Sequence, residues 1–227
     1  MNGKTKKLAV PAIGAVAAIL CSAFLLGIPS EAEASNIYVV NPGGTYMVGD
    51  TITIPILLNP NGNHIKAWEG KILFNRNVLN AVEVTEGDFF DGYQTFFSEG
   101  IINNQLGTII NLYDLTLGQG NKTTEGTILN IEFMAVHTGY CEISPYSFGV
   151  TEETHYLETP TLDNATIFIY SEYDMNFDRQ INMLDLFDVA QHYGETGSPG
   201  WIHQDVSKDG KITVLDLVFI AIHYGTY

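Results

Sequence analysis

DMNFDRQINMLDLFDVAQHYG (Asp174 to Gly194) returns as DVSKDGKITVLDLVFIAIHYG (Asp205 to Gly225), 31 residues further along the chain. Aligned without a gap, 10 of the 21 positions are identical, including the aspartates at positions 1, 5 and 12 of each copy. A repeat this close indicates a duplicated structural unit. We therefore expect two copies of one loop, each followed by one helix.

The first twelve residues of each copy carry the side chains of a calcium-binding loop. Oxygen-bearing side chains stand at positions 1, 3, 5, 9 and 12, the spacing at which an EF-hand-like loop surrounds Ca²⁺, with a backbone carbonyl added from position 7. We therefore predict two Ca²⁺ ions. The ligands expected at positions 1, 3, 5, 7 and 12 are Asp174, Asn176, Asp178, Gln180 and Asp185, then Asp205, Ser207, Asp209, Lys211 and Asp216. The alternative is two acidic surface turns, because Asp and Asn are ordinary turn residues.

Each loop runs into one apolar helix, over residues 184–193 and 215–224, and no amphipathic helix precedes either loop. This arrangement differs from an ordinary EF-hand and resembles the dockerin module of cellulosomes. The resemblance covers residues 171–227 and implies a small α domain that binds a cohesin domain in the presence of calcium. It also implies that loop positions 10 and 11 contact the partner. These positions are Met183, Leu184, Val214 and Leu215, of which the two leucines could instead belong to the core.

Arg179 is a departure from that resemblance. It occupies position 6 of the first loop, where the second copy has Gly210. This position favours a positive φ, so a residue other than glycine costs about 1 kcal/mol. We expect the first site to be slightly weakened for that reason.

The N-terminus has the pattern of a secretory signal peptide. Three lysines precede an apolar run over residues 8–28, and residues 32–34 have the A-x-A form of a cleavage site. We predict a signal peptide over residues 1–34, cleaved after Ala34, and a secreted or cell-surface protein. The apolar run is long enough to span a bilayer, so an uncleaved N-terminal anchor is the alternative.

Charge excludes two classes of partner. Removal of residues 1–34 takes away three lysines and two glutamates, which changes the formal net charge from −16 to −17. A protein this acidic is not expected to bind nucleic acid or an anionic membrane surface. Cys141 would be the one remaining cysteine, so no internal disulfide is expected.

Residues 35–170 have the pattern of an all-β domain. Nine short runs rich in β-branched and aromatic residues alternate with Gly, Asn, Asp and Pro turns, which predicts a sandwich of two sheets. In the third run Trp68, Gly70, Ile72 and Phe74 share one face. Pro55 lies within another run and predicts an edge strand there.

Three stretches of this region resemble a cohesin domain. They are VGDTITIPILL (48–58), IKAWEGKILFNRNVLNAVEV (65–84) and EGTILNIEFMAV (125–136). The resemblance implies a mainly β protein with a nine-stranded jelly-roll β-sandwich that binds a dockerin through one sheet face. The expected order is therefore a signal peptide at 1–34, a cohesin-like sandwich at 35–170 and a dockerin-like domain at 171–227.

No catalytic motif stands out, since G-x-S-x-G, H-E-x-x-H and phosphate-binding loops are absent from the sequence. We expect no enzyme. His192 and His223 share one repeat position and could form a metal pair, but packing at the helix ends accounts for them better.

The predicted function is a non-catalytic extracellular scaffold or adaptor that assembles through calcium-dependent cohesin–dockerin contacts, in polysaccharide-degrading complexes. Its partners would be dockerin- and cohesin-bearing proteins, with polysaccharide binding and head-to-tail self-association left open. One alternative is a carbohydrate-binding module carried by a dockerin; the other is a calcium-stabilised surface or adhesion protein. A carbohydrate-binding module should expose aromatic residues along one sheet face, whereas the runs here place most of their aromatic residues inward. Three residues separate Tyr170 from Asp174, which is too short a link for the tail to occupy a sheet face of its own sandwich.

Overall fold

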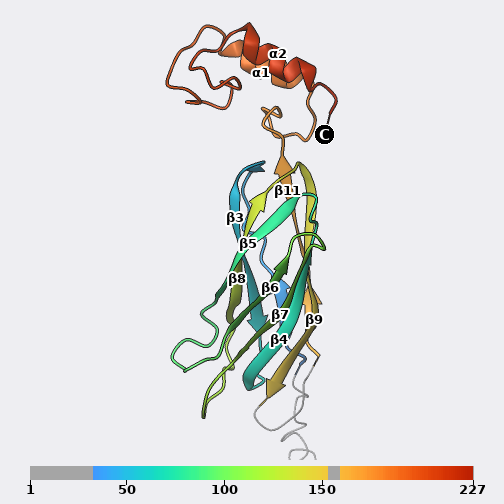
Figure 1. Ribbon diagram of the computed structural model, residues 1–227, viewed down its shortest axis with the longest axis vertical. Helices are drawn as coiled ribbons and strands as arrows, with labels where there is room; N and C mark the ends of the chain where they lie inside the picture. The colour runs from blue at the N-terminus through green and yellow to red at the C-terminus, as the bar shows by residue number, and fades with distance from the viewer. Residues whose placement is uncertain (1–32, 153–158, 227) are drawn as a thin grey trace, which may run out of the picture. The chain divides into compact units, whose positions relative to one another are not determined.

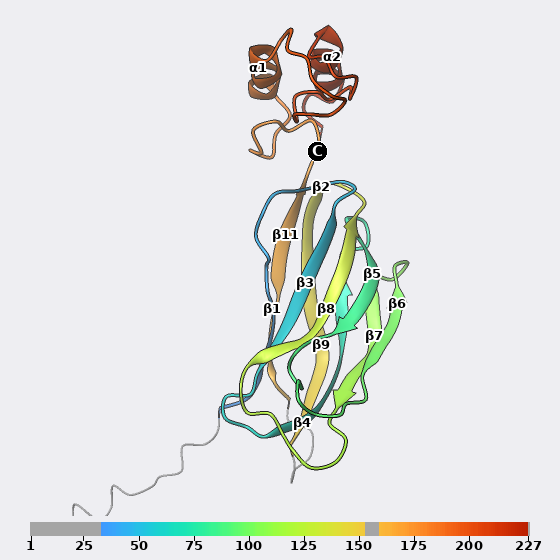
Figure 2. The same cartoon turned by 90° about the vertical axis from the view of Figure 1, so that its left-hand side faces the viewer.

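The structure is a computed structural model that describes residues 33–152 and 159–226. Within these residues a β-sandwich of two sheets is followed by two short helices (Figures 1 and 2). Nearly all of the predicted signal peptide lies outside the described residues. In the part of the chain that is described, no helix is long and apolar enough to cross a membrane.

The first sheet has five strands. Their order across the sheet is β10 (Thr161–Asp163), β1 (Asn36–Val39), β3 (Thr51–Asn59), β8 (Gly126–Ala135) and β5 (Leu79–Glu86). All neighbours pair antiparallel except β10 and β1, which are parallel.

The second sheet has six strands, most of them visible in Figure 2. Their order is β2 (Tyr46–Met47), β11 (Ala165–Tyr170), β9 (Gly139–Glu152), β4 (Ile65–Phe74), β7 (Thr108–Leu115) and β6 (Ser98–Asn103). The described residues therefore contain eleven strands and not nine. The two additional ones, β2 and β10, are short segments that pair in parallel along a sheet edge, and no hydrophobic periodicity marks them.

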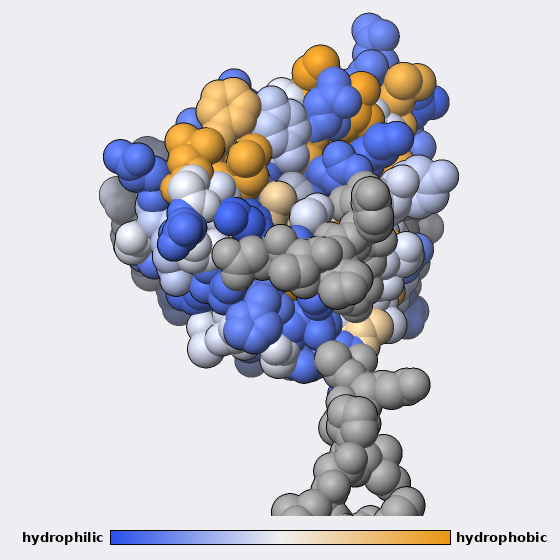
Figure 3. Space-filling model, turned by 90° about the horizontal axis from the view of Figure 1, so that it is seen from below, coloured by the Kyte–Doolittle hydropathy of each residue, from blue (hydrophilic) through white to orange (hydrophobic). Residues whose placement is uncertain are grey.

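Alternation along the strands builds the core between the sheets. Trp68, Gly70, Ile72 and Phe74 of β4 are all buried, as the sequence predicts, and the core is otherwise rich in isoleucine. Seen from below in Figure 3, the surface is largely hydrophilic, with hydrophobic side chains in separate groups.

The prediction from Pro55 was wrong, because β3 lies inside its sheet between β1 and β8. The carbonyl of Pro55 accepts a hydrogen bond from the amide of Val40, one residue beyond the end of β1. A residue in a strand directs its N–H and C=O to the same side. The missing N–H of the proline therefore faces the end of β1 and removes no bond from the ladder with β8.

The two helices are α1 (Met183–Gln191) and α2 (Val214–Ile222), each beginning at a capping box. Their small core contains Val189 and Ile220, one from each helix. The two copies of the repeat are joined by a matching pair of backbone hydrogen bonds. The amide of Gly194 donates to the carbonyl of Ile212, and the amide of Gly225 donates to the carbonyl of Ile181, both at 2.8 Å. The duplication in sequence thus gives near two-fold symmetry in hydrogen bonding.

Candidate functional site

The outward side of β11, β9, β4, β7 and β6, called here the sheet face, carries most of the large apolar side chains that the sandwich strands expose. Leu73, Ile101, Tyr140 and Tyr146 are 38–57% exposed on it. They alternate with core residues along their strands, so the period of two directs them outward. On the strands of the other sheet, the large apolar side chains exposed are Val82 and Met134.

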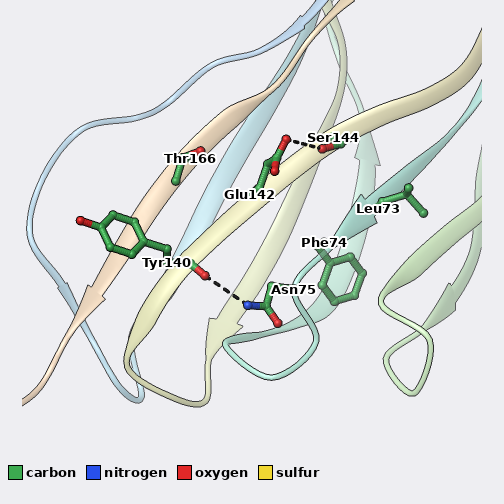
Figure 4. Close-up of a pocket in the computed structure, with 7 residues that line it drawn as sticks. All are labelled: Leu73, Phe74, Asn75, Tyr140, Glu142, Ser144 and Thr166. Atoms are coloured by element: carbon green, nitrogen blue, oxygen red, sulfur yellow. Dashed lines mark hydrogen bonds between the residues drawn. The ribbon is translucent and has the colours of Figure 1, made fainter. Parts of the chain in front are cut away.

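A shallow pocket of about 520 Å³ lies on the sheet face (Figure 4). Its polar groups are fixed by hydrogen bonds. Asn75 Nδ2 donates to the Tyr140 carbonyl at 3.2 Å, and Ser144 Oγ donates to Glu142 Oε1 at 3.2 Å. The lining residues are Leu73, Phe74, Asn75, Tyr140, Glu142, Ser144 and Thr166. Apolar side chains beside a carboxylate and hydroxyl groups make a surface suited to a protein partner.

Aromatic residues form a cluster at one end of this face. Phe168 packs edge-to-face against Tyr140 and Tyr170, with ring centroids 4.7 and 4.8 Å apart. Phe96 and Tyr113 form a second pair, 5.9 Å apart, near the other edge. The expectation that aromatic residues point mostly inward is therefore wrong for the six-stranded sheet, because β9 and β11 place Ile or Cys inward and an aromatic ring outward.

In the repeated loops, the carboxylate at position 1 is buried in both copies. Asp174 is fully buried and Asp205 is 2% exposed. Each accepts hydrogen bonds from the backbone amides four and five residues later, at 3.2 and 2.9 Å in the first loop and 3.2 and 3.0 Å in the second. The chain therefore wraps each loop around its first aspartate in the same way.

The carboxylate at position 12 closes each loop. Asp185 and Asp216 are fully buried, and each accepts at 2.8 Å from the backbone amide of the helix N-cap, Asn182 or Thr213. The second oxygen accepts from an amide near the start of the loop, at 2.7 Å in the first copy and 2.9 Å in the second. Burial acts to raise the pKa of Asp216, but hydrogen bonds from Ser207 and Thr213 outweigh it and lower that pKa.

The remaining predicted ligands lie on the outside of the loops. Asn176, Asp178, Gln180, Asp209 and Lys211 are exposed, and Ser207 is half-buried. Asp178 and Asp209 each accept from the amide two residues later, at 2.9 and 2.8 Å. Among the described residues, no three His, Cys, Asp or Glu side chains gather closely enough to hold a metal by themselves.

A comparison with protein families matches the Cohesin domain model to residues 39–167. This span is more than half of the chain and holds the strands of the sandwich except for residues 36–38 of β1 and residues 168–170 of β11. The chain belongs to the cohesin family.

Solved cohesins have the same fold. A type I cohesin–dockerin complex from Clostridium thermocellum is 14% identical, covers 61% of this chain and 94% of its own, and superposes with a TM-score of 0.50. The cohesin module of a family 33 glycoside hydrolase from Clostridium perfringens is 11% identical, with coverages of 61% and 98% and a TM-score of 0.50. The comparison with curated proteins gave no match. The family match ends at residue 167, before the two repeated loops.

Beyond the cohesin domain, the four predicted contact residues are exposed at the start of the helices. Met183 and Leu184 are 64% and 57% exposed, and Val214 and Leu215 are 61% and 45% exposed. The alternative that the two leucines are core residues is wrong. Two exposed neighbours were not predicted, Phe187 and Val218, at 62% and 46%. They lie one helical turn after Met183, Leu184 and their counterparts, a spacing that could have identified them.

His192 and His223 are the C-caps of α1 and α2. The His223 ring stacks on Tyr173 at a centroid distance of 3.7 Å, and His192 Nδ1 lies 3.1 Å from Glu195. The two histidines thus have separate partners at the helix ends, which agrees with packing and not with a shared metal.

Proposed function

We propose that this protein is a non-catalytic extracellular adaptor. The cohesin domain implies a dockerin-binding role in protein assembly, as in cellulosome scaffolds. In our proposal the sheet face binds a dockerin-bearing protein, and the C-terminal repeat binds a cohesin-bearing protein. The observation that carries this is the family match over residues 39–167 together with the apolar sheet face.

The sheet face is favoured over the opposite face by its composition. Exposed Leu73 shares β4 with charged Glu69 and Lys71, and exposed Tyr146 pairs with Lys71 in the β4–β9 ladder, so apolar contact and orienting charges occur together. The outer side of the five-stranded sheet instead places Glu83 directly opposite Glu132, which puts two like charges next to each other.

We propose that each repeated loop binds one Ca²⁺ ion. The donor set fits a hard cation, because each loop encloses two buried carboxylates that carry several lone pairs. The first ion would be held by Asp174, Asn176, Asp178, Gln180 and Asp185, and the second by Asp205, Ser207, Asp209, Lys211 and Asp216. Bound calcium would offset the buried negative charge and couple metal binding to folding of residues 171–227.

The exposed helix starts are the proposed partner contact of the C-terminal module. Met183, Leu184, Val214 and Leu215 form two matching apolar pairs, so the contact would be hydrophobic. Their relation by the internal repeat suggests that a cohesin could engage the module in either of two orientations.

A carbohydrate-binding role has one observation in its favour, the aromatic cluster on the sheet face. Sugar stacking uses the open face of a ring. The rings of Tyr140, Phe168 and Tyr170 instead meet edge-to-face at 67° and 76°. In this packing, ring faces are directed toward neighbouring rings and are less open to a sugar. Protein assembly is therefore the better supported function.

The proposal includes export. The signal peptide over residues 1–34 would be cleaved after Ala34, or retained as an N-terminal anchor, and either form would act outside the cell in polysaccharide-degrading complexes. The family matched is a non-catalytic module, and we propose no catalytic role for the remaining segments.

Capture from the secretome of the encoding organism tests this function. The mature chain is immobilised, loaded in calcium and eluted with chelator, and the eluted proteins are identified by mass spectrometry. The proposal expects proteins that carry dockerin or cohesin domains. Elution of polysaccharide or of proteins lacking both domains would contradict it.

A further inference from the structure

Arg179 has an unusual backbone and an unusual set of contacts. Its φ of 69° lies in the left-handed region that favours glycine. Its guanidinium donates from Nη1 to the Tyr140 hydroxyl at 2.6 Å. Its Cζ atom lies 5.4 Å from the Tyr140 ring centroid and 5.0 Å from that of Phe168, both within the range of a cation–π contact.

A second residue of the first loop has the same combination. Phe177 has a φ of 58°, and its ring packs edge-to-face on Tyr170 at 5.4 Å. Backbone strain of this kind persists where surrounding contacts hold it in place. The loop itself sets these angles, because Lys208, the counterpart of Phe177 in the second copy, has a φ of 54°. In the first loop the side chains of Arg179 and Phe177 also contact the aromatic cluster of β9 and β11.

We propose that Tyr140 and Phe168 form a guanidinium-binding site at one end of the sheet face, that Arg179 fills it from within the same chain, and that a partner using this end must displace Arg179. The inference rests on the proposed function for its partner. It also corrects the expectation that the tail cannot reach a sheet face of its own sandwich. The first loop follows directly after β11, so a short link suffices to reach the end of the face.

The contact bears on partner binding because Tyr140 belongs to both sites. Tyr140 is one of the residues that line the pocket on the sheet face, and it remains 56% exposed beside Arg179. An exposed cation–π contact is modest in strength. Displacing it should therefore lower the affinity for a partner by roughly two- to fivefold.

Arginine side-chain NMR of the full mature chain tests the internal contact without a partner. The sequence has two arginines, Arg76 and Arg179, so ¹⁵N-arginine labelling gives two Nε–Hε signals, assigned with Arg76→Lys. We expect the Arg179 signal to be displaced upfield by the two rings and to return toward the free-arginine position in Phe168→Leu. Tyr140→Phe, which removes only the hydroxyl, should move the same signal. An Arg179 signal at the free-arginine position, unmoved by either variant, would overturn the site.

The second arm uses the dockerin-bearing protein recovered by capture. Arg179→Gly should bind it about two- to fivefold more tightly than the wild type, while Arg76→Lys should bind it equally. If the wild type binds but Arg179→Gly gives no gain, displacement is refuted and the proposed function stands. If no variant binds, the proposed function and the displacement both fail, while the NMR result still decides the guanidinium site.

Discussion

Trp68 and Asp114 occupy paired positions in the β4–β7 ladder, and both side chains are buried between the sheets, 1% and 2% exposed. A carboxyl group in this position is unusual. Burial raises the pKa of Asp114 to about 7, with a further contribution from the nearby charge of Glu86. An acid whose pKa is higher in the folded state stabilises the fold while it is protonated, and that contribution is lost as the pH rises through the folded pKa.

The sandwich should therefore lose stability between about pH 4 and pH 7. The Asp114 contribution over this range is on the order of 2–4 kcal/mol. Asp114→Asn cannot ionise and should remove most of this slope from urea unfolding followed by Trp68 fluorescence. The exposed Asp91→Asn should retain it. Equal slopes in Asp114→Asn and the wild type would show that Asp114 does not titrate in this range.

The fold could be predicted from sequence where alternation governs it. Trp68 and Ile72 alternate with charged residues, and this pattern gave the sandwich and its inward face. The prediction of an edge strand from Pro55 failed because a proline is tolerated inside the sheet where the neighbouring strand β1 ends. No local sequence pattern shows where β1 ends. The paired strands β2 and β10 were missed for a related reason, since two or three residues have no period.

The site was predictable to a similar degree. The repeat identified the loop carboxylates, because the aspartates recur at positions 1, 5 and 12 of both twelve-residue loops. The aromatic cluster of Tyr140, Phe168 and Tyr170 was missed, because it depends on β9 and β11 being neighbours. The contact with Arg179 depends on the same pairing.

Calcium titration by calorimetry tests the two proposed metal sites. The wild-type mature chain should bind two ions, and Asp185→Ala or Asp216→Ala should each leave one. With calcium at about a hundred times the dissociation constant, each ion adds roughly 2.7 kcal/mol to folding of the module. Asp188→Ala, in α1 outside the loop positions, should still bind two. Two ions retained in both loop variants would refute this ligand assignment.

If a cohesin can bind the C-terminal module in two orientations, a single substitution in one copy of the contact should have little effect on binding. Met183→Asp should weaken a cohesin-bearing partner by about twofold, since the partner can use the second copy instead. Met183→Asp combined with Val214→Asp should abolish binding. The conservative pair Met183→Leu and Val214→Ile should bind normally. Complete loss from Met183→Asp alone would show that one orientation is used.

Light scattering distinguishes an adaptor from a self-assembling chain. If the C-terminal module fitted its own cohesin domain, the contact would be head-to-tail and would make open chains. We expect a monomer across a wide range of protein concentration in millimolar calcium, because an adaptor needs both sites for different partners. An increase in particle mass with protein concentration that a chelator reverses would instead establish self-association.

The most direct test of the account is a calorimetric titration of the captured dockerin-bearing protein into sheet-face variants. Leu73→Asp with Tyr146→Asp places two charges on the six-stranded face, and Val82→Asp with Met134→Asp places two on the five-stranded face. We expect the first pair to lose binding and the second pair to bind as the wild type does. Wild-type affinity in the first pair, or loss in the second alone, would contradict the claim that this cohesin domain binds dockerin through its six-stranded face.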